Sequence, residues 1–318
     1  MKYTLKICLV MMSVLLGAEV LVFSAQAAYP TKKITMYVPY SAGGSSDLGV
    51  RRLSQHLEKV LGQPVIIENV VGAGGWIAWN KLARAKPDGY TLSMFALPYV
   101  AGYLNPATKR NMDLTSLTPL VNHVIDFTAW AALPSFPHKD MKELLEYVKT
   151  NPGKVKVATS GVNTQHHILL IELEKLGYKM EPVHTNGLSD SLAMALGGHV
   201  DIVSLGAGDV RKQVKEGNLQ ALAVMSDRRS PFLPEVPTLA EATGVNLQAF
   251  AARGYAAPGK LDKEASEVLN AAFASVMADP DHVKEMDFMG LEVRYMNSAD
   301  YMKFLKSVEK QYKDALGW

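Results

Sequence analysis

Five short loops rich in glycine, serine, threonine and asparagine carry most of the side chains in this sequence that could hold a ligand. Each loop follows a strand-like apolar run and opens into a helix-like pattern; the loops span residues 41–47 (SAGGSSD), 71–75 (VGAGG), 159–164 (TSGVNT), 185–190 (TNGLSD) and 206–209 (GAGD). In a parallel α/β sheet such loops gather at the carboxyl ends of the strands, where helix N-termini present unpaired N–H groups and partial positive charge. The pattern therefore predicts a binding site for an anion.

The same loops lack the marks of a catalytic site. None of them ends in the GK[ST] sequence of a phosphate-binding loop. Gly72 and Gly74 begin like a dinucleotide fingerprint, but Ile77 occupies the position of its third glycine. Ser160 follows a predicted strand without the GxSxG elbow of a serine hydrolase. We therefore expect a binding protein without a cofactor, and not an enzyme.

Four histidines in the second half of the chain raise the question of a metal site: His166, His167, His184 and His199. Adjacent His166 and His167 point to different faces of a predicted helix, and the sequence has no HExxH or H-x-H arrangement with acidic partners. We therefore expect no metal ion. His167, near the start of its helix, either donates a hydrogen bond to a ligand or packs against its own loop.

Arg253 is the lone charge in the apolar run 249–257 (AFAARGYAA). Burying an arginine is costly unless it meets an anion, and the planar guanidinium matches a carboxylate with two parallel hydrogen bonds. Arg253 is therefore a candidate clamp for a ligand carboxylate. The alternative is a permanent ion pair with an internal aspartate or glutamate.

Residues 1–27 have the composition of a secretory signal peptide. Lys2 and Lys6 accompany an apolar stretch, and residues 25–27 (AQA) supply a small-x-small cleavage pattern. A retained membrane anchor is the rival interpretation, but a glycine and a glutamate interrupt the stretch before the roughly 20 apolar residues that a span requires. We expect export to the periplasm with cleavage after Ala27.

The composition narrows the class of protein further. Cys8 is the only cysteine and lies in the predicted signal peptide, so the mature chain must be stabilised by its core without a disulfide. Removing residues 1–27 lowers the formal net charge from +2 to +1, and the basic residues are dispersed. This balance argues against nucleic acid as a partner and against strong attraction to a membrane surface.

The elements that must position the loops alternate between strands and helices. Residues 34–40, 64–68 and 90–96 are predicted strands. The predicted helix before Gly62 places four apolar residues on one face: Leu53, Leu57, Val60 and Leu61. The alternation starts again near residue 155, which indicates a second α/β unit.

Two α/β units in one chain predict two lobes with a ligand cleft between them. Residues 120–133 and 246–258 are long enough to cross from one unit to the other. We place lobe 1 at residues 28–131 plus 252–318 and lobe 2 at residues 132–251.

A family resemblance rests on many segments that occur in one order. They are YPTKKITMYVPYSAGGSSD, LGQPVIIENVVGAGGWIAWNKLARAKPDGYTL, ALGGHVDI, GNLQALAVMSDRRSPFLPEVPTLAEATG and ARGYAAPG. Together they resemble the extracytoplasmic receptors of tripartite tricarboxylate transporters, the Bug-type solute-binding proteins. The resemblance implies the two-lobed fold of periplasmic binding proteins, which closes around a small organic carboxylate and delivers it to membrane permease subunits. We expect a monomer.

The resemblance also implies which residues line the cleft. Lobe 1 would contribute Tyr40, Ser41, Gly44, Ser45 and Asp47. Lobe 2 would contribute Thr159, Ser160, Asn163, Thr164, His167, Asn186, Asp190, Ala207 and Gly208, with Arg253 from the second crossing segment. Many relatives carry tryptophan where this chain has Ala252, so the distal pocket differs in shape.

The sequence thus predicts a periplasmic receptor for a di-, tri- or aromatic carboxylate. A periplasmic ligand sensor for a membrane signalling protein would use the same fold and pocket, and it remains the alternative.

Overall fold

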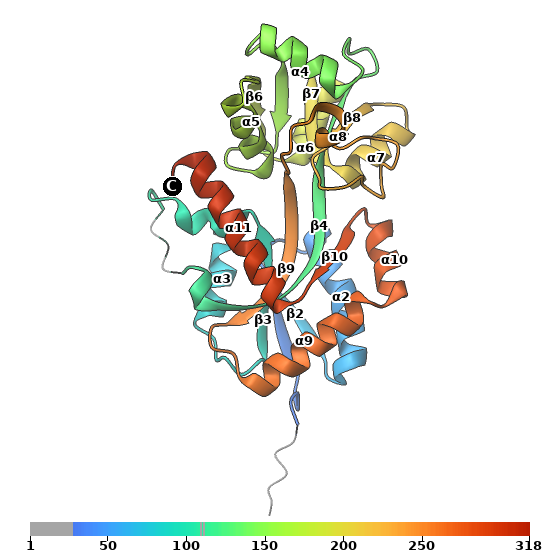
Figure 1. Cartoon of the computed structure of the whole chain (residues 1–318). Coiled ribbons are helices and arrows are strands. Elements are labelled where there is room, and N and C mark those ends of the chain that lie inside the picture. Colours follow the sequence, from blue (N-terminus) through green and yellow to red (C-terminus); the bar gives the residue numbers. More distant parts are fainter. Residues whose placement is uncertain (1–27, 109, 111) are drawn as a thin grey trace, which may run out of the picture.

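The computed structural model describes residues 28–108, 110 and 112–318, with every side chain in these ranges except that of Ser45. The predicted signal peptide, which includes Cys8, lies outside the described residues (Figure 1). In the part of the chain that the structure describes, we find no helix with the length and apolar character needed to cross a bilayer.

The first lobe is built on a mixed sheet with the strand order β2-β1-β3-β9-β4, in which β10 also pairs with β4. Its strands are β1 (Ile34–Val38), β2 (Val65–Asn69), β3 (Thr91–Leu97), β4 (Leu117–Ala132), β9 (Phe250–Pro258) and β10 (Glu292–Met296). Strand β1 is parallel to β2 and β3, whereas β9 is antiparallel to β3 and β4. The carboxyl ends of β1 and β3 therefore meet at one edge of this sheet.

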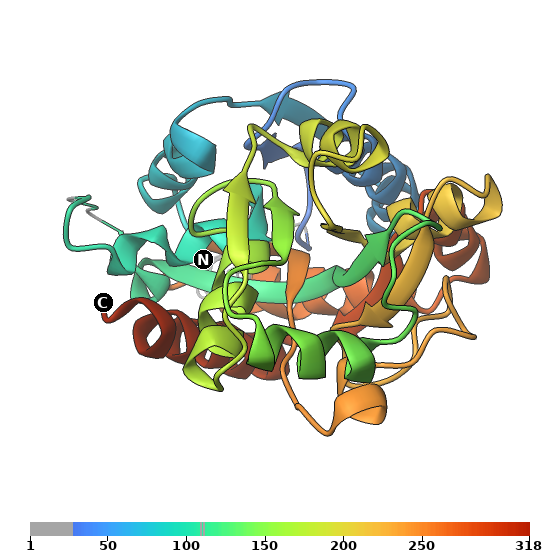
Figure 2. The ribbon, with the colours of Figure 1, turned by 90° about the horizontal axis from the view of Figure 1, so that it is seen from above.

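Helices cover both sides of the first sheet. They are α2 (Ser45–Leu61), α3 (Trp76–Ala83), α9 (Lys263–Met277), α10 (Pro280–Phe288) and α11 (Ser298–Leu316), with short 3-10 turns η1 (Ala73–Gly75), η2 (Tyr99–Leu104) and η3 (Leu114–Ser116). In both views α2 and α10 lie on one side of the sheet, and α3 and α11 lie on the other (Figure 1 and Figure 2).

Helix α2 ends where the sequence predicts. Gly62 adopts a left-handed conformation with φ 65° and caps the helix through its N–H, which donates to the carbonyl of Glu58. Leu53 and Leu57 on the predicted apolar face are buried, whereas Val60 near the end of the helix is 47% exposed. The apolar face of α2 is therefore exposed to solvent at Val60, in the last turn of the helix.

The second lobe repeats the α/β pattern on a sheet with the order β4-β7-β5-β6, to which β8 is joined through β4. Its further strands are β5 (Lys156–Thr159), β6 (Glu181–His184), β7 (Ile202–Gly206) and β8 (Gln220–Val224). Its helices are α4 (Met141–Thr150), α5 (Gln165–Lys175), α6 (Leu188–Leu196), α7 (Ala207–Lys215) and α8 (Leu239–Thr243). Strand β5 is parallel to both β6 and β7.

Strands β4 and β9 connect the two lobes, as Figure 1 shows. Residues 117–127 of β4 pair with β9, and residues 128–132 pair with β7 and β8 of the second sheet. The architecture is the two-lobed α/β fold with two crossing segments. The lobe boundaries predicted at 131/132 and 251/252 fall inside these two continuous strands and stay a prediction.

One apolar core extends from the first lobe into the second, and a further core lies within the second lobe. The core of the first lobe includes the large side chains of Trp79, Phe95 and Tyr255, all buried. The second lobe encloses Trp130, whose Nε1 donates to Ser204 Oγ at 3.2 Å. Loops at the carboxyl ends of strands from both lobes meet around a cavity beside the two crossing strands.

Candidate ligand-binding cleft

A cavity of about 290 Å³ lies between the lobes. Its walls come from the carboxyl ends of β1, β3, β5 and β7, from the starts of three helices and from the two crossing strands. The lining residues are Tyr40, Ser46, Ala96, Leu97, Tyr99, Asp126, Thr128, Ser160, Gln165, His166, Asn186, Gly187, Leu188, Gly206, Ala251, Ala252 and Arg253. A larger hollow of about 640 Å³ adjoins it and shares Asp126, Leu188 and Arg253. This is where ligands bind in open α/β folds.

Four polar atoms in the cavity wall are buried and have no hydrogen-bond partner among the described residues. They are the hydroxyl oxygens of Tyr40 and Thr128, Oδ1 of Asp126 and Oε1 of Gln165. Leaving such a group unsatisfied costs roughly 1 to 3 kcal/mol, so proteins rarely keep several together without a ligand or ordered water. Their convergence indicates that the cavity receives a polar molecule.

Asp126 extends from β4 toward the start of α7. A Cβ atom at residue 206 would lie 2.5 Å from Asp126 Oδ1 and 2.7 Å from its Cγ, so only glycine leaves room for the carboxyl group there. Burial raises the pKa of Asp126 to about 7, although the positive charge of Arg253 and the backbone N–H of Ala207 act in the opposite direction. The Asp126 carboxyl group therefore changes protonation state near neutral pH.

Arg253 lies in β9, where it pairs with Ala96 of β3 and Val124 of β4. Its positive charge acts on the polar groups around the cavity. Burial raises the pKa values of Tyr40, Tyr99 and Asp209, and Arg253 partly offsets each increase. Arg253 therefore lies at the cavity and acts on the acid Asp126 as well.

The structure brings four of the predicted site residues to the cavity: Tyr40, Ser160, Asn186 and Arg253. Gly208 lines the adjoining hollow. The side chain of Ser45 lies outside the description. The remaining predicted residues do not line either hollow in this conformation; they are Ser41, Gly44, Asp47, Thr159, Asn163, Thr164, His167, Asp190 and Ala207. Their role as ligand contacts stays a prediction.

Asp47 shapes the first predicted loop from beneath. It is 1% exposed, and its carboxylate accepts hydrogen bonds from the N–H of Gly43, from Arg51 Nε and from Asn69 Nδ2, each at 2.9 Å. Burial acts to raise the pKa of Asp47, but these three hydrogen bonds outweigh it and hold the pKa below its usual value. The carboxylate fixes the loop to α2 and to the end of β2.

We therefore expect Asp47→Ala to destabilise the protein. The substitution leaves the N–H of Gly43 without its acceptor and removes one of the two acceptors of Asn69 Nδ2, which costs about 1 to 3 kcal/mol of unfolding free energy. Urea denaturation at pH 7 measures this loss. Asp190→Ala is the matched control, because Asp190 is exposed in the first turn of α6, and its replacement should change stability far less. Equal stability of the two variants would contradict the scaffold role of Asp47.

The second predicted loop is held by hydrogen bonds among its own residues. Thr164 Oγ1 donates to the carbonyl of Gly161 at 2.8 Å, and the N–H of Asn163 donates to His167 Nδ1 at 3.0 Å. Thr159 Oγ1 lies 2.7 Å from His184 Nδ1. In this conformation His167 therefore packs against its own loop, the second of its two predicted roles.

Several cavity residues were not predicted, and Asp126 is the most important. It is the only charged residue in the apolar strand β4, which is the same signal that drew attention to Arg253. Gln165 and His166 at the start of α5 also face the cavity. Burial lowers the pKa of His166 to about 3, and its Nδ1 lies 3.1 Å from Ser160 Oγ, so a neutral histidine positions that serine.

Comparison with known proteins assigns the same architecture to a family. Residues 50–316 match the family described as "Tripartite tricarboxylate transporter family receptor". Protein BugT of Bordetella pertussis is 36% identical over 221 residues, which are 67% of this chain and 66% of BugT. A TctC solute-binding protein from Polaromonas superposes with a TM-score of 0.82 at 25% identity, covering 91% of this chain and 99% of that one. MatC from Rhodopseudomonas palustris, solved with bound malate, has a TM-score of 0.71 at 26% identity, covering 90% and 99%.

Proposed function

Because this chain belongs to the tripartite tricarboxylate transporter receptors, a family of solute-binding proteins and not of enzymes, we propose that it captures a small organic carboxylate for delivery to a membrane permease. The ligand is a di-, tri- or aromatic carboxylate, and the site is the cavity between the lobes.

The convergence of hydrogen-bonding groups on one cationic side chain carries this proposal. Tyr40 and Thr128 offer hydroxyl groups, and Arg253 supplies positive charge in the same cavity. A carboxylate oxygen accepts from all of these donor types. The cavity of about 290 Å³ is at the small end for ligand pockets, which favours a compact acid. Malate, bound in the related MatC, is such a molecule.

The proposed cellular location follows from the family and from the predicted signal peptide. Receptors of this family are periplasmic binding proteins, and the proposal places the mature chain in the periplasm after removal of residues 1–27. There it would meet both the external solute and the permease subunits. The receptor would act as a monomer with one ligand in its cleft.

A thermal-shift screen tests the proposal. Malate, succinate, citrate, adipate and benzoate are the acids, and the corresponding amides are the uncharged controls. A ligand at 100 times its dissociation constant stabilises the folded state by about 2.7 kcal/mol, which a melting curve resolves. We expect at least one acid to raise the melting temperature and its amide to leave it unchanged. A panel in which every acid is inert would refute the carboxylate proposal.

The affinity for the acid should depend on pH through Asp126. Its pKa near 7 means that the carboxyl group is mostly protonated at pH 6 and mostly ionised at pH 8. The protonated form donates to a ligand carboxylate, whereas the ionised form repels it. Calorimetry should therefore show up to about tenfold tighter binding at pH 6 than at pH 8.

The variant Asp126→Asn removes this titration and should flatten the pH profile. Arg253 and Asp209 are the charged groups that act on the pKa of Asp126, and both remain in place in the Asp126→Asn variant. An affinity that increases with pH would contradict this model of the site. It would instead indicate that the ionised Asp126 receives a hydroxyl or ammonium group of the ligand.

A further inference from the structure

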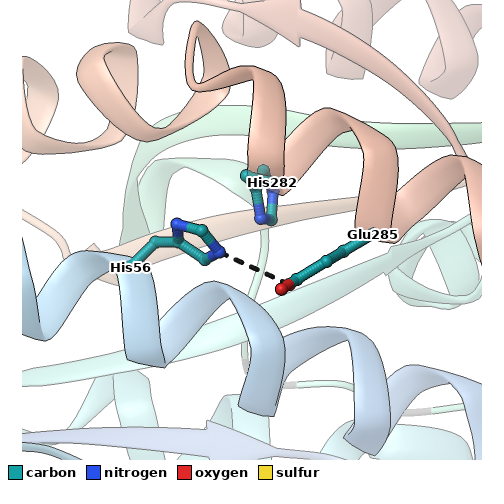
Figure 3. A group of neighbouring side chains, drawn as sticks. All are labelled: His56, His282 and Glu285. Carbon is teal, nitrogen blue, oxygen red and sulfur yellow. Dashed lines mark hydrogen bonds and ion pairs between the residues drawn. The ribbon is translucent and has the colours of Figure 1, made fainter.

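We propose that His56, His282 and Glu285 form a binding site for a divalent transition-metal ion such as Zn²⁺, at the contact between α2 and α10. Each residue offers one ligand atom, and the three atoms all lie within 4.8 Å of one another. Figure 3 shows the three side chains pointing toward a common point between the helices. Two histidines and a glutamate are a ligand set that Zn²⁺ commonly takes in proteins.

The spacing of His56 and Glu285 fits a metal better than it fits a direct hydrogen bond. His56 Nε2 lies 3.4 Å from Glu285 Oε2, which is long for a hydrogen bond between charged groups. Two ligand atoms on a tetrahedral zinc ion, each bonded at about 2.0 to 2.1 Å, lie about 3.3 to 3.4 Å apart. The pair therefore already has the separation that a shared ion requires.

The surroundings of His56 prepare its Nε2 for a metal. His56 Nδ1 lies 2.9 Å from Asp279 Oδ2, a contact that favours the tautomer with its ring proton on Nδ1. This leaves a lone pair on Nε2, which faces the carboxylate of Glu285. A carboxylate on the far nitrogen is the usual partner of a metal-binding histidine, because it fixes the tautomer and the ring orientation.

Buried residues of the first lobe hold the ring of His282 in position. Its Nε2 lies 2.9 Å from His123 Nε2, and His123 in turn lies 3.4 Å from the hydroxyl of Tyr255. Nδ1 of His282 is buried and has no hydrogen-bond partner among the described residues, so it is the nitrogen available to an ion. A neutral imidazole with a free ring nitrogen is the form of histidine that binds metals.

Two of the three residues border a hollow at the surface, and His282 lies buried behind them. A hollow of about 600 Å³ is lined by His56 and Glu285 together with residues of α2 and α10. With three ligands from the protein, a tetrahedral ion would take its fourth ligand, a water or a solute, from this hollow. The ion would join two helices that are far apart in the chain, and its binding would therefore stabilise the first lobe.

The sequence did not predict this group. The expectation of no metal was based on spacing among His166, His167, His184 and His199, and none of these belongs to the cluster found among the described residues. His282 and Glu285 follow each other at helical spacing on α10, but their partner His56 lies on α2. Only the packing of α2 against α10 brings them together.

Zinc titration of the untagged, chelator-stripped protein tests the proposal, with no organic acid present. We expect one equivalent of Zn²⁺ to bind in competition with a chromophoric chelator, and Co²⁺ to give the visible absorption of a four-coordinate site. Glu285→Gln is the main variant because this side chain is 39% exposed and its replacement should not disturb folding. We expect it to weaken Zn²⁺ binding at least tenfold, and Asp279→Asn to weaken it about ten- to a hundredfold.

The matched control is His138→Gln. His138 Nδ1 also contacts a carboxylate, that of Glu143 at 3.1 Å, but His138 belongs to no group of three ligands among the described residues. This variant should bind zinc as the unaltered protein does. The proposal is overturned if the unaltered protein binds no stoichiometric Zn²⁺, which would mean that a protonated His56 bridges Asp279 and Glu285 instead. It is equally overturned if Glu285→Gln and His56→Gln, shown to be folded by circular dichroism, both retain full zinc affinity.

Discussion

Replacing Arg253 by alanine is expected to lower the affinity for the best-binding organic acid by about ten- to a hundredfold. Arg253 supplies positive charge to a cavity whose other polar groups are neutral or acidic. A charge-assisted hydrogen bond to a carboxylate contributes about 1.5 to 3 kcal/mol, which corresponds to that loss. Isothermal calorimetry at pH 6, where Asp126 is mostly protonated, measures the effect most directly.

Two further variants separate the shape of the guanidinium from its charge. Arg253→Lys keeps the charge but not the planar fork, so it should recover only part of the affinity. Arg52→Ala removes an exposed arginine from α2, away from the cavity, and should leave the affinity unchanged. A general loss of positive charge would instead affect both alanine variants alike.

The competing role of Arg253, an internal ion pair with Asp126, predicts a different result. In that case Arg253→Ala would leave a buried acid without its neighbouring cation and would destabilise the ligand-free protein. Adding Asp126→Asn should then restore stability. If Arg253→Ala lowers stability, Asp126→Asn restores it and the folded variant keeps its affinity, Arg253 belongs to the scaffold and not to the ligand site.

The sequence predicted best what depends on local chemistry. Gly62 ends α2 because the residue that closes the helix is left-handed, a conformation that glycine adopts readily. The glycine is visible in the sequence, so the end of the helix could be predicted from it. The apolar runs that became β4 and β9 predicted the crossing segments for the same reason. The loop glycines and serines likewise marked the edge of the sheet where the cavity lies.

What the sequence could not supply is the direction of side chains across distant strands. Asp126 reaches the cavity because of the register in which β4 pairs with β9 and with β7. The sequence of one strand does not determine this register. Asp47 has the right type and position for a ligand contact, yet its carboxylate is used by the loop itself. The exposed Val60 shows the same limit on a helix. Periodicity predicts which residues share a face, but not how far along the helix other elements pack against that face.

Gly206→Ala should damage both stability and ligand binding, although it adds a single methyl group. The new Cβ would lie 2.5 Å from Asp126 Oδ1, far closer than van der Waals contact permits. The carboxyl group must therefore move, into the cavity or against its other neighbours. Overpacking of this kind costs about 1 to 3 kcal/mol of unfolding free energy. A displaced Asp126 would also occupy part of the ligand's space, so affinity should fall together with stability.

Gly187→Ala is the matched control for this substitution. Gly187 also lines the cavity, but a Cβ there would meet no atom within 4 Å, so stability should be preserved. The double variant Gly206→Ala/Asp126→Ala removes the group that the methyl displaces, and its loss of stability should be smaller than the sum of the two single losses. Strictly additive losses would show that the cost of Gly206→Ala does not arise from the carboxyl group of Asp126. The coupling energy between Gly206 and Asp126 therefore measures how far the absence of a side chain at the start of α7 serves to accommodate the carboxyl group from β4.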